Sequence, residues 1–280
     1  MIRHPWIPGP LAVVLVCALG GEGRGVPRAS PPQLEPGQVL RLTFPDLPPT
    51  LLAMSQGKEV EAAVTVRLPD NYTRDGSFPL FVFLNGGDGG EGGNIGVPMQ
   101  LSEGRDCIIA TFPLFKRGYD AAEPWGISVG FDDYPIVSAA YAAVMDRLRA
   151  TIPNIDAGRS IIGGHSNGAH TIAVLLSALD DGFLGSFKGF FMIDGGFDWS
   201  SYGRSIPLKD HRMLYLVGGG TEHSPWWRRD VVQRARFFER CVQDLGMDYV
   251  KVFVADGVDH QFSRSYHPVI KEWAAGVMAP

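Results

Sequence analysis

Short, largely apolar runs recur along the chain and alternate with segments of helical spacing. The runs span 80–84, 107–112, 160–163, 190–193, 213–217 and 250–254. A strand that is apolar at consecutive positions is buried on both faces, as strands are in a parallel sheet covered by helices. Residues such as Val231, Ala235 and Phe238, which recur every three or four positions, indicate the covering helices. The alternation predicts an α/β fold, a three-layer α/β/α sandwich with a mostly parallel central sheet.

One junction between a run and a helical segment carries the pattern Gly164-His165-Ser166-Asn167-Gly168. A serine in a sharp turn between a strand and a helix is held with its hydroxyl exposed. Glycines two positions away on each side keep side chains out of the neighbouring strand and helix. The pattern therefore predicts a nucleophile at Ser166, and an ordinary strand-to-helix turn is the alternative.

The partners of such a nucleophile are expected where other runs end, because ligand sites of parallel sheets lie at the carboxyl ends of the strands. Glu222 follows the run at 213–217, and His260 follows the run at 250–254. The order Ser166, Glu222, His260 suits a catalytic triad. In that triad His260 takes the serine proton, and Glu222 holds the imidazole in the required tautomer.

The acid of this triad has competitors in the sequence. Asp230 lies on the same connection as Glu222, at a position where it would cap the next helix, and Asp194 follows the run at 190–193. His223 is the second candidate for the base. Ordinary exposed side chains are the alternative for each of these residues.

A tetrahedral intermediate also needs hydrogen-bond donors for its oxyanion. The backbone N–H of Asn167, at the start of a helix, is one expected donor. The glycine-rich stretch after the run at 80–84 is expected to supply the other, at Gly87 or Asp88. Its acidic and amide oxygens suggest calcium binding as an alternative, but their spacing fits no EF-hand loop. We therefore expect no metal in this loop, and a plain flexible turn is the other alternative.

Two consecutive tryptophans, Trp226 and Trp227, follow the loop that carries Glu222. On the expected active face they would form a substrate-binding surface, because indole rings stack on sugar rings and on aromatic acyl groups. Packing in the core is the alternative for both side chains.

The first 20 residues have the form of an export signal, with a basic start, an apolar stretch at 11–19 and small residues near its end. The apolar stretch is shorter than the about 20 residues that cross a bilayer. We therefore expect cleavage, a secreted or periplasmic protein, and no membrane span afterwards, rather than a retained anchor. Residues 21–36, rich in proline and glycine, are expected to form a linker, and 37–280 the catalytic domain.

Composition limits the class of partner. The 280 residues are 45% hydrophobic and 20% charged, as expected for a globular protein with one large core. The net charge of −5 is spread without a basic block, which argues against nucleic acid and anionic membranes as partners. Outside the export signal, Cys107 and Cys241 could pair in an oxidising compartment, but buried free thiols are the preferred interpretation.

Together these residues resemble the α/β-hydrolase superfamily. The motifs that carry the resemblance are 164–169, 84–87 and 257–262. The segment 66–72 is also similar to secreted esterases of the feruloyl esterase, esterase D and polyhydroxyalkanoate depolymerase type. The resemblance implies an α/β-hydrolase fold. It also implies a serine esterase that needs no cofactor, with an acyl-enzyme intermediate and a small-molecule or polysaccharide-linked ester as substrate.

Two positions depart from the family pattern. Family enzymes often have histidine where Asn85 stands, and commonly aspartate where Glu222 stands. The first departure matters little where the oxyanion donors are backbone groups, whereas the second leaves the acid open. The alternatives to an esterase are a peptidase of the same fold and a catalytically inactive glycan-binding protein.

Overall fold

The structure is a computed structural model that describes residues 34–44, 52–55, 58–87, 89–90, 92, 94–103, 105–116, 129–196 and 201–280. The chain divides into two units, Met1–Pro32 and Gln33–Pro280, and all described residues belong to the second. The expected export signal and most of the expected linker therefore lie outside the described residues. Asp88, the second choice for an oxyanion donor, also lies outside them.

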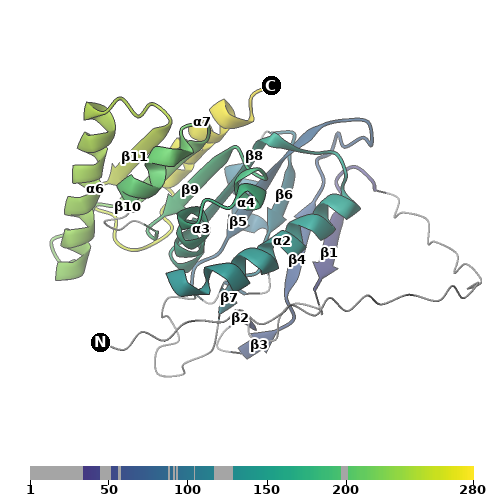
Figure 1. The fold of residues 1–280 in the computed structure, drawn as a ribbon, viewed down its shortest axis with the longest axis horizontal. Helices are drawn as coiled ribbons and strands as arrows, with labels where there is room; N and C mark the ends of the chain where they lie inside the picture. Colours follow the sequence, from purple (N-terminus) through teal and green to yellow (C-terminus); the bar gives the residue numbers. More distant parts are fainter. Residues whose placement is uncertain are drawn as a thin grey trace, which may run out of the picture. The chain divides into compact units, whose positions relative to one another are not determined.

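Eight strands form the central sheet, in the order β1-β4-β6-β5-β8-β9-β10-β11 (Figure 1). They are β1 (Val39–Thr43), β4 (Ala63–Arg67), β5 (Phe78–Leu84), β6 (Ile108–Thr111), β8 (Ile155–His165), β9 (Gly189–Ile193), β10 (Arg212–Gly218) and β11 (Val250–Ala255). β4 runs antiparallel to β1 and β6, whereas every neighbouring pair from β6 to β11 is parallel. The mostly parallel sheet that the apolar runs predict is confirmed.

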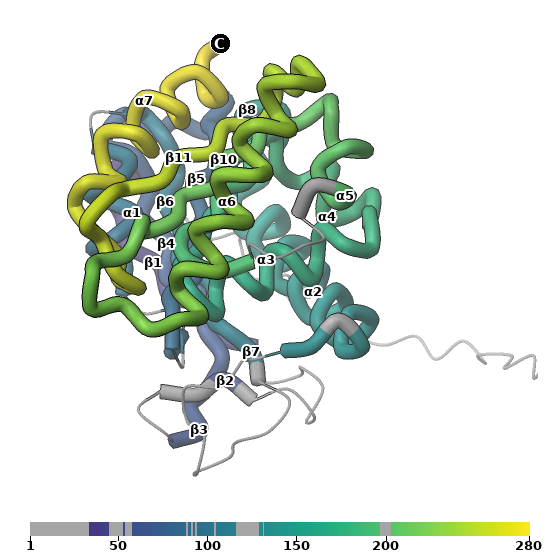
Figure 2. Tube along the Cα trace, turned by 90° about the vertical axis from the view of Figure 1, so that its left-hand side faces the viewer, coloured from purple at the N-terminus to yellow at the C-terminus, as the bar shows by residue number. Residues whose placement is uncertain are grey.

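Helices cover both faces of this sheet (Figure 2). They are α1 (Gly96–Leu101), α2 (Tyr134–Thr151), α3 (Asn167–Ser177), α4 (Asp181–Leu184), α5 (Ser201–Ser205), α6 (Trp226–Asp244) and α7 (Tyr266–Met278), with 3₁₀ helices at Phe131–Asp133 and Ile206–Leu208. Leu80 and Val82 of β5 belong to the core cluster that includes α2 and α3. Their neighbours Phe81 and Phe83 point to the opposite face, where they pack with α1 and α7. The three-layer sandwich is thereby confirmed.

The remaining strands form a small second sheet in the order β3-β2-β7. They are β2 (Leu52–Ser55), β3 (Lys58–Val60) and β7 (Phe115–Lys116), and both pairs are antiparallel. Within the described ranges, no helix has both the length and the apolar character needed to cross a membrane.

The two cysteines of the described chain are free. Cys107 is buried, and its burial raises the pKa of the thiol to about 12. A thiol with so high a pKa stays protonated and behaves as a small apolar group. Cys107 is therefore a buried free thiol, as expected, whereas Cys241 is free but only partly buried.

Four consecutive strands of the sheet position the candidate site. In sheet order β8, β9, β10 and β11 are neighbours and run parallel, so their carboxyl ends lie along one edge. Ser166 follows β8, Asp194 follows β9, and the loop with His260 follows β11. Residues far apart in the chain therefore converge at this edge, as ligand sites of parallel sheets do.

Candidate active site

Ser166 lies in a tight turn between β8 and α3. Its backbone has φ 53° and ψ −116°, a strained conformation for a residue other than glycine. Its N–H donates to the carbonyl oxygen of Ile193 at 2.8 Å. A Cβ at Gly164 would lie 2.6 Å from the backbone of Gly168, and a Cβ at Gly168 would collide with the carbonyl oxygen of Leu84. The turn therefore requires both glycines of the sequence pattern.

The Ser166 hydroxyl meets an imidazole from a distant part of the chain. Oγ of Ser166 and Nε2 of His260 are 3.0 Å apart, although 94 positions separate the two residues. His260 stands on the loop between β11 and α7. An imidazole at this distance can accept the hydroxyl proton as the oxygen attacks, which is the arrangement of a nucleophile and its general base. The structure thus brings together two of the three residues expected to form the triad.

Two ring systems flank the His260 imidazole. The His165 ring stacks on it, with centroids 5.6 Å apart and an interplanar angle of 27°, and the Trp227 ring stands edge-on at 6.3 Å. Burial, and then the neighbouring His260, lower the pKa of His165 to about 4. His165 is therefore neutral at neutral pH and offers His260 a ring surface rather than a second positive charge.

The expected acid, Glu222, does not meet this imidazole. Its side chain is 84% exposed, and its carboxylate pairs with Nε2 of His223 at 3.2 Å. Asp230, the competitor on the same connection, pairs with Arg234 one turn further along α6. The described contacts of Glu222 therefore do not support its expected role as the acid of the triad. Its carboxylate lies in solvent.

The physical reason lies in how the loop between β10 and α6 folds. Ser224, rather than Glu222, reaches the loop of His260, where its hydroxyl donates to the carboxylate of Asp259. The N–H of Thr221 donates in turn to Oγ of Ser224 at 2.7 Å. Asp259 directly precedes His260, so this bridge anchors the backbone that carries the imidazole. We find no local signal for the bridge in the sequence.

A different carboxylate acts on His260. Asp194 directly follows β9, its side chain is fully buried, and its backbone has a φ of 49°. Burial is the largest influence on the pKa of His260 and lowers it, whereas the charge of Asp194 raises it and that of Arg228 lowers it. Asp194, which the sequence analysis keeps as a competitor, is therefore the acid whose charge reaches this imidazole.

The Asp194 carboxylate accepts hydrogen bonds from three elements. Oδ1 accepts from the N–H of Gly218 at 2.8 Å, at the end of β10, and from the guanidinium of Arg228 in α6. Oδ2 accepts from the hydroxyl of Tyr266 at 3.2 Å, at the start of α7. Burial, followed by the charge of Asp194, raises the pKa of Tyr266 well above its usual range. The sequence does not predict these contacts of Arg228 and Tyr266, because both residues lie within helical segments that carry no motif.

The glycine-rich loop after β5 packs against the turn of Ser166. Nδ2 of Asn167 donates to the carbonyl oxygen of Gly87 at 3.0 Å, and Gly87 has a φ of 61°. A Cβ at Gly86 would lie 2.8 Å from Nδ1 of His165. The two residues expected to supply oxyanion donors, Asn167 and Gly87, are thus in contact beside Ser166. The sequence motif predicts a role for the backbone of Asn167 but not the hydrogen bond from its side chain to the loop.

The tryptophan pair opens α6 and is not part of the core. Trp226 is 73% exposed and Trp227 is 42% exposed, which excludes the core-packing alternative. Trp227 contacts the ring of His260. The pair therefore offers an exposed aromatic surface that reaches the imidazole.

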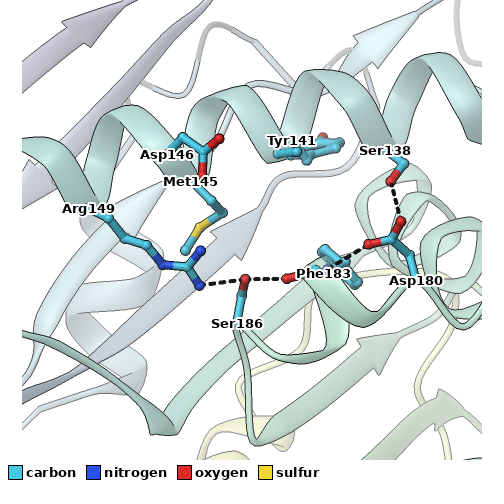
Figure 3. Close-up of a pocket in the computed structure, with 10 residues that line it drawn as sticks. Ser138, Tyr141, Met145, Asp146, Arg149, Asp180, Phe183 and Ser186 are labelled. Carbon is cyan, nitrogen blue, oxygen red and sulfur yellow. Dashed lines mark hydrogen bonds between the residues drawn. The ribbon is translucent and has the colours of Figure 1, made fainter.

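A hollow of about 80 Å³ lies away from Ser166, between α2 and α4 (Figure 3). Arg149 donates to Oγ of Ser186 at 2.7 Å across it. Asp180 accepts from the Tyr134 hydroxyl at 3.0 Å and from the N–H of Phe183 at 2.8 Å. These bonds connect α2 with the segment around α4, so the hollow lies at a packing contact between two helices. In the part of the chain that the structure describes, no three His, Cys, Asp or Glu side chains gather as metal ligands would.

No protein-family model matches the sequence, and no curated protein sequence matches it. The structure, in contrast, is similar to solved esterases. One is a thermostable esterase with a TM-score of 0.53 and 19% identity over 85% of this chain, which spans 62% of that esterase. The feruloyl esterase module from Clostridium thermocellum, solved with sinapinate, has a TM-score of 0.53 and 13% identity, covering 87% of this chain and 89% of that module. A ferulic acid esterase from the anaerobic fungus Anaeromyces mucronatus has a TM-score of 0.51 and 15% identity. The match covers 90% of this chain and 95% of that esterase.

At these identities the comparison establishes the fold. The eight-stranded, mostly parallel sheet with helices on both faces is the α/β-hydrolase fold. The resemblance inferred from the motifs around Ser166 and His260 is therefore confirmed in the architecture. This chain covers less than two thirds of the thermostable esterase, so what that whole protein does is not carried over.

Proposed function

We propose that the protein is a serine hydrolase that cleaves carboxylic esters. The observation that carries the proposal is the 3.0 Å contact between Oγ of Ser166 and Nε2 of His260. The backbone of Ser166 adds support, because strain of this kind persists only where the surrounding structure imposes it, and it is common at reactive residues. The similarity of the fold to solved esterases favours esters as the substrate class.

In the proposed reaction, His260 accepts the proton of Ser166 as Oγ bonds to the ester carbonyl carbon. The carbonyl oxygen becomes an oxyanion, to which the backbone N–H groups of Asn167 and Gly87 donate. The C–O bond to the alcohol then breaks, and the departing alcohol takes the proton from His260. Water, deprotonated by His260, attacks the resulting acyl-enzyme, and the carboxylic acid leaves as Ser166 regains its proton.

We assign the acid of this triad to Asp194 in place of Glu222. A triad acid is a buried carboxylate that stabilises the imidazolium formed during the reaction. Asp194 is fully buried, and its charge raises the pKa of His260. Glu222 is 84% exposed, and water screens its charge.

Trp227 marks where the alcohol part of the ester binds. Because His260 gives its proton to the departing alcohol, that part of the substrate must lie beside the His260 ring. Trp227 stands edge-on to this ring at 6.3 Å, and the exposed Trp226 extends the surface. Indole rings stack on sugars and on aromatic rings, so we propose a glycosyl or aromatic alcohol part, including alcohols that belong to a polysaccharide.

Replacing Trp227 with Ala is expected to raise KM about fivefold for an ester with an aromatic alcohol, because a ring–ring contact of about 1 kcal/mol is lost. The KM for the methyl ester of the same acid should stay within about twofold, since a methyl group is too small to reach the indole. Steady-state kinetics on the two esters measures the difference. Phe237→Ala, at an exposed aromatic side chain of the same helix, is the matched control. An equal rise for both esters would show that Trp227 contacts the acyl part instead.

The proposed function is tested with a fluorophosphonate probe, which bonds to activated serine hydroxyls without a known substrate. The wild-type protein should be labelled, and Ser166→Ala should not. Parallel panels of p-nitrophenyl esters and aminoacyl p-nitroanilides separate an esterase from a peptidase of the same fold. A folded wild-type protein that stays unlabelled would contradict the proposal and favour the catalytically inactive binding protein.

We also propose that the protein is exported and that 37–280 is its catalytic domain. The support for export is the pattern of residues 1–20, a basic start followed by a short apolar stretch and small residues. The support for the domain is that every residue assigned above to the reaction lies between Gly87 and His260.

A further inference from the structure

Glycines at the end of β10 and just after it make room for a buried arginine. A Cβ at Gly218 would collide with a guanidinium nitrogen of Arg228, and a Cβ at Gly220 would touch Cγ of the same side chain at 3.5 Å. Arg228 belongs to the first turn of α6, yet its side chain is only 2% exposed. The guanidinium passes the glycines and reaches the carboxylate of Asp194. The same glycine at 218 also leaves room for the backbone oxygens of Val258 and Asp259, so this stretch accommodates both the buried cation and the loop of His260.

The buried position of Arg228 costs folding free energy, so a contribution to stability does not explain why the cation is there. Its Nε is buried with no hydrogen-bond partner in the described structure, and an unpaired buried donor costs about 1–3 kcal/mol. A buried ion pair is itself weak evidence for stability, because apolar side chains of similar volume often do as well. A role in the chemistry of the site is the simpler reason for a cation at this place.

Two consecutive residues of α6 contact the imidazole and the acid. Trp227, the preceding residue, stands edge-on to His260, while Arg228 turns inward and bonds to Asp194. The guanidinium and the hydroxyl of Tyr266 hold different oxygens of that carboxylate. Rotation of the carboxylate would break both bonds, so Arg228 fixes its orientation.

The groups facing His260 come from several elements. Ser166 and His165 face it from the end of β8, and His165 is neutral at neutral pH. The charges that act on it are the anion of Asp194 and the cation of Arg228, with opposite effects on its protonation. Asp259, next to it in the chain, is bonded to Ser224. Arg228 is therefore the charged side chain that opposes protonation of His260.

We propose that Arg228 is a positioning residue that orients the Asp194 carboxylate and offsets its negative charge at the site of His260. The inference rests on the proposed function, in which only neutral His260 accepts the serine proton. Loss of the cation would leave the anion of Asp194 uncompensated and stabilise the imidazolium. His260 would then hold its proton up to a higher pH, and the rising limb of the pH profile of kcat/KM would move upward.

The test compares Arg228→Gln, which removes the charge but keeps an N–H donor, with Arg228→Lys, which keeps the charge but loses the planar fork. We expect Arg228→Gln to move the limb up by about one pH unit, since a nearby charge of like sign shifts a pKa by about that much or more. Activity well below the limb would then fall about tenfold relative to the plateau. Arg228→Lys should keep the limb within about 0.3 unit and lose plateau activity. Arg229→Gln, an exposed loss of the same charge next in the chain, is the matched control and should leave the limb in place.

An NMR titration of the His260 ring without substrate reads the same shift independently of catalysis. It separates failure of this inference from failure of the proposed function, because the midpoint is measurable in an inactive protein. A purely structural role would weaken both variants without moving the midpoint, and equal midpoints in wild type, Gln and Lys variants would overturn the inference. If Arg228→Gln does not fold, the same titration compares Asp194→Asn with the double variant Asp194→Asn and Arg228→Gln, which leaves no buried charge of the pair unpaired. A higher midpoint in the double variant supports the inference, and equal midpoints overturn it.

Discussion

Replacing Ser166 with Ala is expected to lower kcat for p-nitrophenyl acetate by about 10⁶-fold, the scale seen when a serine nucleophile is removed. The loss follows from the 3.0 Å contact with Nε2 of His260, because no other atom of residue 166 can form the acyl bond. KM should change little, since Oγ contributes mainly to the transition state. Initial rates at saturating ester, with thermal unfolding as a check of the fold, measure the effect.

Ser177→Ala is the matched control for this loss. Ser177 lies at the other end of the same helix, α3, where its hydroxyl donates to the carbonyl oxygen of Val174 at 2.6 Å. This substitution removes the same atom from the same element and should leave kcat within about twofold, as surface changes away from a site usually do. Residual activity of Ser166→Ala within tenfold of wild type would show that another group carries the reaction.

Asp194→Asn is expected to lower kcat by about 10³- to 10⁴-fold, while Glu222→Gln leaves it within about twofold. An amide at 194 no longer favours the required imidazole tautomer or stabilises the imidazolium. Glu222 is 84% exposed and pairs with His223, so its charge is screened from the site. Steady-state kinetics on one ester compares the two variants. The reverse ranking would return the acid of the triad to Glu222.

Stability has to be measured alongside this result. Asp194→Asn leaves the buried guanidinium of Arg228 without its anion, and breaking a buried pair costs about 3–5 kcal/mol. The double variant Asp194→Asn with Arg228→Gln removes both charges and avoids an unpaired buried ion. Urea unfolding should show the double variant to be more stable than Asp194→Asn, while its kcat stays as low. Recovery of kcat together with stability would mean that Asp194 acts through folding alone.

The positions of Ser166 and His260 could be inferred from sequence because local features predict them. Gly164 and Gly168 are required by steric contacts within a few residues of the turn, and these contacts leave a visible pattern. His260 follows an apolar run whose strand had to lie in the sheet. In both cases secondary structure and burial, which hydrophobic spacing reveals, were enough to place the residue at the correct edge.

The acid could not be inferred in the same way. Glu222 and Asp194 each follow a strand of the same sheet, so the rule that places sites at strand ends does not distinguish them. The distinction depends on the loop at 219–225, where Ser224 turns toward Asp259 and leaves Glu222 in solvent. Such a turn depends on hydrogen bonds between loops that are distant in the chain, and hydrophobic periodicity carries no information about them.

The sequence by itself determined the layered architecture, the strained turn of Ser166 and the strand ends that carry Ser166 and His260. Each of these follows from short-range sterics or from which segments must be buried. Only the tertiary structure distinguished the two carboxylates, because it buries Asp194 and leaves Glu222 exposed. That difference depends on Arg228 and Tyr266, two helical residues without a motif, whose side chains reach Asp194 from α6 and α7. Buried charges are stabilised by partners gathered from the whole fold, and such partners become visible only when the elements are packed together.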